Sequence, residues 1–282
     1  MDREACKWNS ALTSNVCAGA AILVFLSVGS AASQDRASLL SIARSQLVKG
    51  RLPDCQRTLE AILIAEPRDT AALKLQSDAY YLSGEDAKAE ASLLKAIDIE
   101  PRNAELHYAL GRIYYQESRP EPASEQFNKT IEIDPASYKA WDNLGLCYQA
   151  LNRDPEAIRA FLKALDLVHE KHRDYEWPYA NLADLLIQQG DYEKAFELAA
   201  EAAERNPRSA RNFYLTGKAL VKMHKLDLGI RWLKRATEVD PDYPQAHYLL
   251  ALTYRETGQV EEGKRELRQF QEARAKTPQH RR

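Results

Sequence analysis

The sequence predicts an all-α solenoid, because one helical-hairpin pattern recurs along most of its 282 residues. The pattern is clearest over residues 138–164, where Trp141, Leu144 and Tyr148 fall three or four positions apart, as on one face of a helix. A second amphipathic stretch follows and places Phe161 on its apolar face. One such hairpin cannot bury its apolar face alone, so neighbouring hairpins must stack.

The hairpin pattern returns at a fixed period of 34 residues. Leu110 and Phe127 stand 34 positions before Leu144 and Phe161, and further copies lie on either side. Five copies end in a proline, which stops the second helix: Pro67, Pro101, Pro135, Pro207 and Pro241. The turn inside the hairpin is predicted at Gly50, Gly84, Asn152, Gly190 and Gly258, residue types that accept a left-handed backbone.

The pattern W-x2-L-G-x2-Y followed by A-x3-F resembles the tetratricopeptide repeat, whose period is 34 residues. The resemblance covers about residues 36–277 and implies a right-handed superhelical solenoid of about seven helix-turn-helix repeats. The implied repeats are residues 36–69, 70–103, 104–137, 138–171, 176–209, 210–243 and 244–277, with an insertion at 172–175 and a tail at 278–282. Because the fourth repeat lacks its closing proline, we expect its second helix to run on for about one extra turn.

Residues 1–32 lie before the first repeat and do not follow its pattern. Their composition predicts a secretory signal peptide. Arg3 and Lys7 precede the apolar run Val16–Val28, and small residues then lead to a cleavage site after Ala32. The apolar run is shorter than the roughly 20 residues that span a bilayer. The predicted location is therefore periplasmic or secreted. The alternative is an uncleaved N-terminal membrane anchor, and membrane contact is expected only in that case.

The composition and motifs argue against catalysis, metal binding and nucleic-acid binding. The sequence has no phosphate-binding loop, no dinucleotide-binding glycine pattern and no nucleophile elbow, and its net charge is −2. His169, Glu170 and His172 do not have the spacing of a zinc protease motif. We therefore expect no enzymatic activity, no catalytic residue, no metal and no cofactor.

The resemblance implies that the chain binds a protein or an extended peptide segment. In tetratricopeptide arrays the first helix of each repeat lines a concave groove, and ligands contact repeat positions 2, 5, 6, 9, 12 and 13. The implied contact residues are Lys74, Tyr81, Tyr108, Arg112, Tyr115, Lys139, Asn143, Trp177, Asn181, Asp184, Arg211, Tyr214 and Lys218. The same faces also carry Asp78, Glu105, Asp142, Gln149, Gln188, Lys222, Gln245, Tyr248 and Arg255. Tyrosine, tryptophan and arginine are the residues that interface cores favour.

Two subclasses of the family give more specific expectations. Chaperone-binding arrays hold a C-terminal carboxylate with a set of lysine and asparagine positions, and Asp78 stands here where that set requires asparagine. Binding of chaperone tails is therefore disfavoured. The arrays of O-GlcNAc transferases stack asparagines that hold a peptide backbone, and Asn143 and Asn181 would form two rungs of such a ladder.

The leader and the repeat-only build resemble exported bacterial repeat proteins of the cell envelope, including pilus- and secretion-assembly scaffolds. The resemblance implies an adaptor that uses its concave groove. Two alternatives stay open: a scaffold that acts through its convex surface or array ends, and an accessory subunit of an envelope complex or enzyme.

Overall fold

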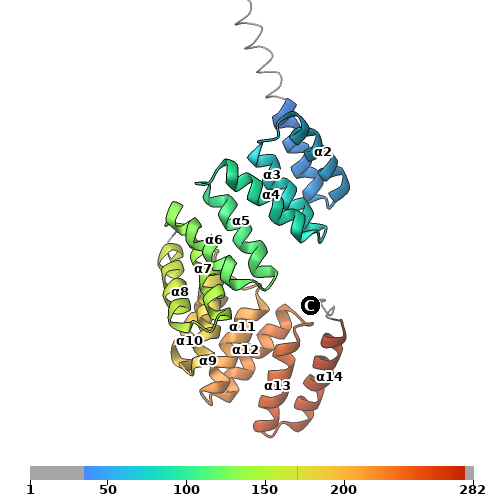
Figure 1. Cartoon of the computed structure of the whole chain (residues 1–282). Coiled ribbons are helices and arrows are strands. Elements are labelled where there is room, and N and C mark those ends of the chain that lie inside the picture. Colours follow the sequence, from blue (N-terminus) through green and yellow to red (C-terminus); the bar gives the residue numbers. More distant parts are fainter. Residues whose placement is uncertain (1–34, 170, 277–282) are drawn as a thin grey trace, which may run out of the picture. The chain divides into compact units, whose positions relative to one another are not determined.

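The computed structural model describes residues 35–169 and 171–276, and over these ranges it consists of helices and short turns without a β-strand (Figure 1). This confirms the predicted all-α fold. The chain divides into two compact units, residues 1–113 (unit 1) and residues 114–282 (unit 2), and each is described by itself. The predicted signal peptide and the tail lie outside the described residues. None of the described helices is long and apolar enough to cross a bilayer.

The helices alternate between the first (A) and second (B) helix of successive hairpins. The A helices are the helix over residues 35–48, α3 (Thr70–Leu82), α5 (Ala104–Gln116), α7 (Tyr138–Ala150), α9 (Trp177–Gln189), α11 (Ala210–Lys222) and α13 (Pro244–Glu256). The B helices are α2 (Leu52–Ala65), α4 (Asp86–Ile99), α6 (Pro120–Ile133), α8 (Asp154–Val168), α10 (Tyr192–Arg205), α12 (Leu226–Val239) and α14 (Val260–Lys276). The boundary between the units falls within α5.

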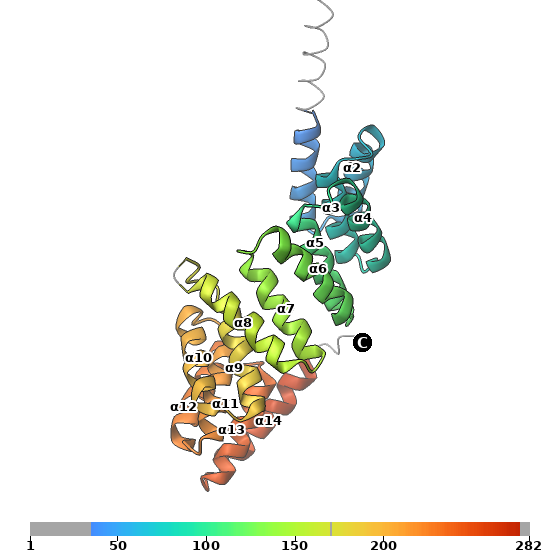
Figure 2. The same ribbon diagram turned by 60° about the vertical axis from the view of Figure 1, so that its left-hand side comes forward.

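In unit 2 each A helix packs against its own B helix and against the next A helix. Contacts join α7 to α8, α11 to α12 and α13 to α14, and also α7 to α9, α9 to α11 and α11 to α13. Figure 1 shows α11, α12, α13 and α14 packed in chain order, and Figure 2 shows the same helices from another side. The A helices therefore form a continuous layer, and their side chains that point away from the B helices share one face. We call it the A-helix face of unit 2.

The turn between the A and B helix has the same backbone conformation in every hairpin of the described residues. One residue in each turn has a positive φ: Gly50, Gly84, Ser118, Asn152, Gly190, His224 and Gly258. The predicted glycine and asparagine positions are confirmed. Ser118 and His224 were not predicted, because the prediction took only glycine and asparagine as signals for a left-handed backbone.

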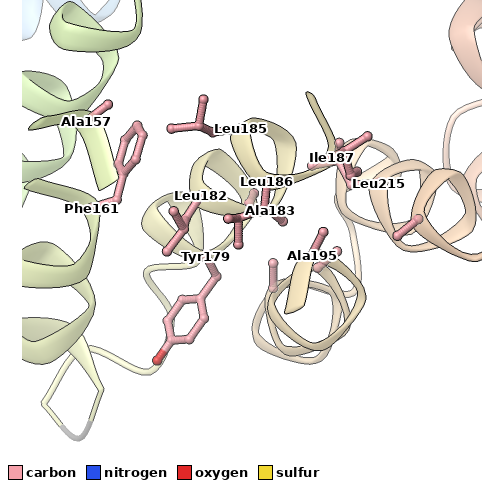
Figure 3. Close-up of a cluster of buried hydrophobic side chains, with 14 of the residues drawn as sticks. Ala157, Phe161, Tyr179, Leu182, Ala183, Leu185, Leu186, Ile187, Ala195 and Leu215 are labelled. Atoms are coloured by element: carbon pink, nitrogen blue, oxygen red, sulfur yellow. The ribbon is translucent and has the colours of Figure 1, made fainter. Parts of the chain in front are cut away.

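Small residues on the A helices allow the B helices to approach closely. A Cβ atom added at Gly145 would lie 2.5 Å from the Phe161 ring, and one added at Gly217 would lie 2.7 Å from Leu233. Figure 3 shows the core of unit 2, with Phe161 of α8 beside the buried leucines of α9. Close approach buries large side chains completely, as the zero exposure of Phe161 shows.

The ring nitrogen at the tryptophan position of the repeat bonds to the proline that closes the preceding repeat. In unit 2, Trp141 Nε1 donates to the Pro135 carbonyl at 3.0 Å, and His247 Nε2 lies 2.9 Å from the Pro241 carbonyl. In unit 1, His107 Nε2 lies 2.9 Å from the carbonyl of Pro101. Histidine can stand at the tryptophan position of the repeat, because either ring can donate a hydrogen bond to the proline carbonyl.

The expected extra turn at the end of the fourth repeat is wrong. α8 ends at Val168, and the described residues between it and α9 form turns. Arg205 of α10 holds this segment: its guanidinium donates to the carbonyls of His169 at 3.2 Å and His172 at 3.5 Å. The same guanidinium lies 4.2 Å from the centroid of the Tyr179 ring. These bonds satisfy carbonyls that a longer helix would have used.

Candidate functional site

Five of the predicted contact residues come together on the A-helix face of unit 2. Trp177 begins α9, and Asp184 lies two turns further along the same helix. Arg211, Tyr214 and Lys218 lie on α11, which packs against α9. The positions predicted from the repeat pattern therefore form one cluster that joins two neighbouring A helices.

Arg211 lies at the centre of this cluster and is incompletely paired. Its guanidinium carbon lies 6.0 Å from the centroid of the Trp177 ring, and Nη2 lies 4.0 Å from Asp184 Oδ2. The distance to Asp184 exceeds that of a hydrogen bond. Nη1 is buried and has no hydrogen-bond partner among the described residues. A buried guanidinium nitrogen without an acceptor is energetically unfavourable.

A second cation and two tyrosines complete the cluster. Lys218 Nζ donates to Asp184 Oδ1 at 3.3 Å and lies 5.8 Å from the centroid of the Tyr214 ring. The rings of Tyr214 and Tyr243 meet edge to face, with centroids 5.6 Å apart. Burial raises the pKa of Tyr243 to about 12, so its hydroxyl stays protonated at neutral pH. Tyr243 was not predicted, because it precedes α13 and lies outside the contact positions of the repeat.

Asn181, predicted as a rung of the asparagine ladder, is instead part of a buried network. Its side chain is only 4 % exposed, and Nδ2 donates to Asp142 Oδ1 at 2.9 Å. Tyr175, in the segment before α9, donates its hydroxyl to Asp142 Oδ2 at 3.1 Å. Asn143 Nδ2 donates to the Lys139 carbonyl of its own helix at 2.8 Å. Asn181 is therefore too buried to contact a peptide as a rung of the ladder, and the role of Asn143 stays a prediction.

Asp142 is a buried carboxylate whose hydrogen-bond donors are neutral. Burial raises its pKa from 3.8 to about 6, although the bonds from Asn181 and Tyr175 and the charge of Arg211 oppose the rise. Tyr175 was not predicted as part of the site. The sequence signal that could have located it is the insertion itself, which brings a tyrosine two residues before Trp177.

Besides Asn143 and Asn181, the predicted residues outside the cluster are Tyr115, Lys139 and the four in unit 1. Burial raises the pKa of Tyr115, and Lys139 Nζ lies 5.8 Å from the centroid of the neighbouring Tyr138 ring. In unit 1, Tyr81 and Tyr108 are partly buried and Arg112 is exposed. These positions have the exposure that a peptide contact requires, and their role stays a prediction.

The charges on the A helices of unit 1 neutralise one another. Lys74 Nζ lies 2.7 Å from Glu105 Oε1 and 3.9 Å from Asp78 Oδ2. Burial raises the pKa of Asp78, and the nearby charges of Lys74 and Arg112 oppose that rise. Two cations and two carboxylates therefore balance on α3 and α5, within unit 1.

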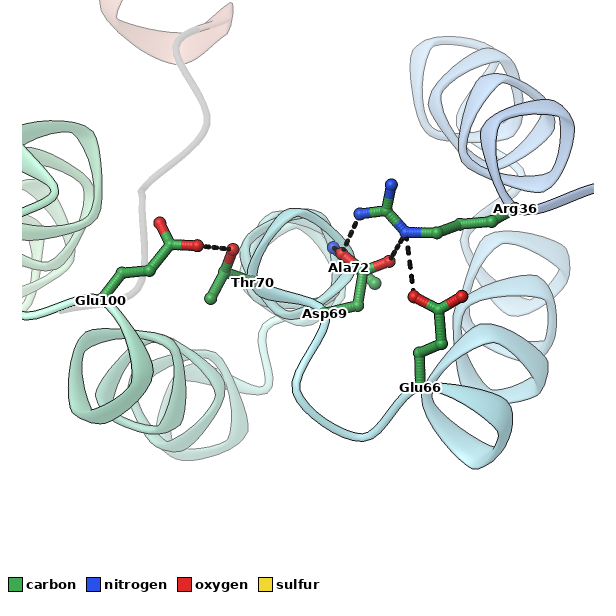
Figure 4. Close-up of polar contacts among 6 residues, drawn as sticks. All are labelled: Arg36, Glu66, Asp69, Thr70, Ala72 and Glu100. Atoms are coloured by element: carbon green, nitrogen blue, oxygen red, sulfur yellow. Dashed lines mark hydrogen bonds and ion pairs between the residues drawn. The ribbon is translucent and has the colours of Figure 1, made fainter. Parts of the chain in front are cut away.

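A second network in unit 1 begins α3 (Figure 4). Asp69 accepts from the Ala72 backbone N–H at 3.0 Å, which caps the helix, and it binds Arg36 through both carboxylate oxygens at 2.5 and 2.8 Å. Glu66 also lies within 3.3 Å of the Arg36 guanidinium. Burial opposes the ionisation of Asp69, but the bonds from Arg36 and Ala72 outweigh it and lower the pKa of that carboxyl.

The described residues also include two buried cysteines and a hollow beside α8. They contain no group of three His, Cys, Asp or Glu side chains that could hold a metal ion. Burial raises the pKa of Cys147 to about 12 and also raises that of Cys55, so both thiols are protonated and unreactive. A hollow of about 670 Å³ lies beside α8 and is lined by Leu162, Leu165, Asp166, Leu167, His169, Lys171 and Tyr179.

Comparison with known proteins gives one family and many similar folds. Tetratricopeptide repeat models match residues 137–208, 104–137 and 244–277, and a further TPR repeat model matches residues 78–118 and 217–258. No curated protein sequence matches the chain.

Solved structures of repeat proteins share the fold. The structure of PilF from Pseudomonas aeruginosa is 20% identical with a TM-score of 0.66, over 77% of this chain and 96% of that one. A tetratricopeptide repeat protein from Parabacteroides merdae is 16% identical with a TM-score of 0.67, over 87% and 95%. YrrB, described as a TPR protein with an unusual peptide-binding site, is 18% identical with a TM-score of 0.53, over 67% and 95%.

At these identities the likeness shows the fold alone. The helical hairpins with their recurring left-handed turn, together with family matches across residues 78–208 and 217–277, show that the chain belongs to the tetratricopeptide repeat family.

Proposed function

We propose that this protein is a non-enzymatic adaptor that binds a protein or an extended peptide on the A-helix face of unit 2. The observation that carries the proposal is Trp177, whose side chain is 48% exposed at the start of α9 beside Arg211. Exposure of the apolar indole surface to water is unfavourable. Tryptophan and arginine are also the residue types that contribute most to binding energy at interfaces.

The same face is fixed before any partner arrives. α9 is buried along most of its length, and α11 packs against it through Leu215 and Ala219. A rigid face needs no reordering on binding, so the loss of conformational freedom falls on the peptide alone. YrrB, with its described peptide-binding site, is an analogy at the level of the fold.

A selection from a displayed random-peptide library, with the full chain as bait, tests the proposal. We expect enriched peptides whose affinity for Trp177→Ala is about tenfold weaker than for the unaltered protein. Leu228→Ala is the matched control, because it removes an exposed apolar side chain from α12, a B helix. Enriched peptides that bind both variants equally well, or a library without enrichment, would overturn the proposal.

We further propose that the adaptor acts in the cell envelope, as an exported protein or an anchored one. The support is the leader of residues 1–32, with its charged start, apolar run and small residues before Ser33. Mass measurement of the N-terminal peptide from separated soluble and membrane fractions distinguishes the two. A new terminus near Ser33 indicates export with cleavage, and an intact terminus in the membrane fraction indicates an anchor. An intact terminus in the cytosolic fraction contradicts both.

The second candidate function is an assembly scaffold, or an accessory subunit of an envelope complex, that acts through the B helices. It is favoured by the hollow beside α8, where Leu162 is 51% exposed. Size-exclusion chromatography with light scattering separates the two functions for the isolated chain. Oligomers that grow with concentration and disappear in Leu162→Glu favour self-assembly, and a monomer at all concentrations favours the adaptor.

A further inference from the structure

We propose that the partner segment is acidic and that its side-chain carboxylates bind a row of cations on α11, made by Arg211, Lys218 and Lys222. This inference rests on the proposed function and specifies the chemistry of its ligand. We call these three residues the cationic row.

The cationic row follows from the spacing of its members. The three residues are seven and four positions apart, which on a helix of 3.6 residues per turn places them nearly in one line. The row is about 16 Å long, because each helical residue advances the axis by about 1.5 Å. Lys222 is exposed, and the side chains of Arg211 and Lys218 are 30% and 25% exposed. A ligand on this face can therefore reach all three.

The charge of the row is not balanced within its surroundings. Asp184 is the carboxylate closest to it, at 3.3 Å from Lys218 Nζ and 4.0 Å from Arg211 Nη2. Asp142 lies within electrostatic range of Arg211 and supplies a second negative charge, because its hydrogen-bond donors Asn181 and Tyr175 are neutral. Among the described residues of this site, three cations thus face two carboxylates, which leaves one positive charge in excess. The A-helix face of unit 2 carries an excess of positive charge that an acidic ligand would compensate.

Arg211 identifies the preferred group as a carboxylate. Its side chain is 30% exposed, and Nη2 lies too far from Asp184, at 4.0 Å, for a hydrogen bond. A planar guanidinium binds a carboxylate through two parallel hydrogen bonds. The Trp177 ring beside it can pack on the aliphatic part of a glutamate side chain while the carboxylate meets the guanidinium.

The length of the row favours side-chain carboxylates over a single C-terminal one. Lys218 and Lys222 are about 6 Å apart along the helix axis, and Arg211 lies about 10 Å further back. Alternate residues of an extended peptide point to the same side and lie about 7 Å apart. An extended segment with acidic residues at alternate positions therefore meets more than one cation, which a terminal carboxylate does not.

Fluorescence anisotropy with synthetic peptides and the full chain tests this inference. The probe is an amidated, fluorescein-labelled peptide of about twelve residues in which glutamate and serine alternate. A glutamine–serine peptide with an amidated end is the neutral counterpart, and the same peptide with a free C-terminal carboxylate tests the terminal source. We expect only the glutamate peptide to bind, and its affinity to fall as ionic strength rises from about 0.05 to about 0.5 M.

Variants that should change the affinity for the glutamate peptide in opposite directions make the test sharper. Arg211→Gln should weaken binding of the glutamate peptide about tenfold, and Lys218→Gln several-fold. Asp184→Asn should strengthen it several-fold, because the substitution removes the competing carboxylate from the row. Arg231→Gln is the matched control, because it removes one exposed cation from α12, a B helix, and should leave the affinity unchanged. Melting temperatures of all variants show that each is folded.

Three results would overturn the inference: no binding of the glutamate peptide up to about 1 mM, equal binding of the neutral peptide, or equal losses in Arg211→Gln and Arg231→Gln. Binding of the free-carboxylate peptide alone would replace it with recognition of a C-terminus. The library selection distinguishes this failure from failure of the proposed function. If Trp177-dependent peptides are enriched but are neutral or basic, the binding face stands and the cationic row is excluded as its acidic-peptide receptor.

Discussion

The A helices of the two units carry similar residue types but handle charge in opposite ways. In unit 1, Lys74 is bonded to Glu105, and Asp69 is bonded through both oxygens to Arg36. In unit 2, Arg211 keeps a buried nitrogen without an acceptor, and Asp142 is held by neutral donors. Charges that are paired inside a unit stabilise its helices, whereas charges that are left unpaired can bind a partner.

The difference therefore separates structural polar groups from candidate binding groups, although the repeat pattern places both at equivalent positions. Lys74 and Lys218 were both predicted as ligand contacts, and each has a carboxylate partner at 2.7 and 3.3 Å respectively. Of these two sites in the described residues, only the cationic row that includes Lys218 has a surplus cation. The comparison predicts that neutralising a buried carboxylate changes the free energy of unfolding in opposite directions in the two units.

The largest expected effect is at Asp69 in unit 1. Asp69→Ala removes the cap of α3 and leaves Arg36 without its main partner, so we expect the free energy of unfolding to fall by about 3 kcal/mol. Thermal melting gives the magnitude, and hydrogen exchange of the α3 amides shows the location. Asp69→Asn is the control, since it keeps an acceptor for the Ala72 N–H and should lose less. Equal losses in both variants would show that the ion pair contributes nothing.

The opposite effect is expected at Asp142 in unit 2. Its folded pKa of about 6 lies above its ordinary value of 3.8, so the folded state binds the proton more tightly than the unfolded state. The stability gained by this protonation is present below pH 4 and is lost as pH rises through 6. Asp142→Asn is neutral at every pH; its Oδ1 can still accept from Asn181, and its Nδ2 can donate to the Tyr175 hydroxyl, which reverses that bond.

We therefore expect Asp142→Asn to be more stable than the unaltered protein by about 2 kcal/mol at pH 7, with the difference vanishing near pH 4. Chemical denaturation of both proteins across this pH range measures it. Asp69→Asn should show the reverse trend, because a lowered pKa gives stability that is present above the ordinary value and is lost as pH falls. Parallel pH profiles for the two variants would contradict the contrast between the units.

The smallest expected effect concerns the hairpin turns. Both turns in unit 1 use glycine at positive φ, Gly50 and Gly84, whereas three of the five in unit 2 use another residue. His224→Gly should raise the free energy of unfolding by up to about 1 kcal/mol, because it relieves a left-handed backbone that histidine disfavours. Gly84→Ala should lower it by a similar amount. A melting temperature that falls in His224→Gly would show that the side chain contributes more than the strain.

The sequence pattern predicted the parts of the fold that repeat and missed the parts that depend on distant contacts. The period, the prolines and the turn glycines locate the hairpins because each hairpin is built from local spacing. The segment after α8 was predicted as helix, but Arg205, more than thirty residues later, binds the carbonyls of His169 and His172. No local signal contains that contact.

The candidate site was predicted in position and only partly in role. The repeat register placed Trp177, Arg211 and Lys218 on one surface, because equivalent positions of successive A helices are neighbours. It also placed Asn181 there, which the structure buries against Asp142 and Tyr175. Register alone gives the direction of a side chain. Burial and pairing depend on the partners that the insertion and the next helix supply.

Photo-crosslinking of a library-selected peptide tests the central claim most directly. A benzophenone amino acid would replace Tyr214 on the A-helix face of unit 2, Tyr108 on the A helices of unit 1, or Arg231 on α12, each in the full chain. The account predicts strong crosslinking from position 214 that unlabelled peptide suppresses, and little from positions 108 and 231. Crosslinking that is strongest from position 108 or 231 would contradict it and move the binding face away from unit 2 or away from its A helices.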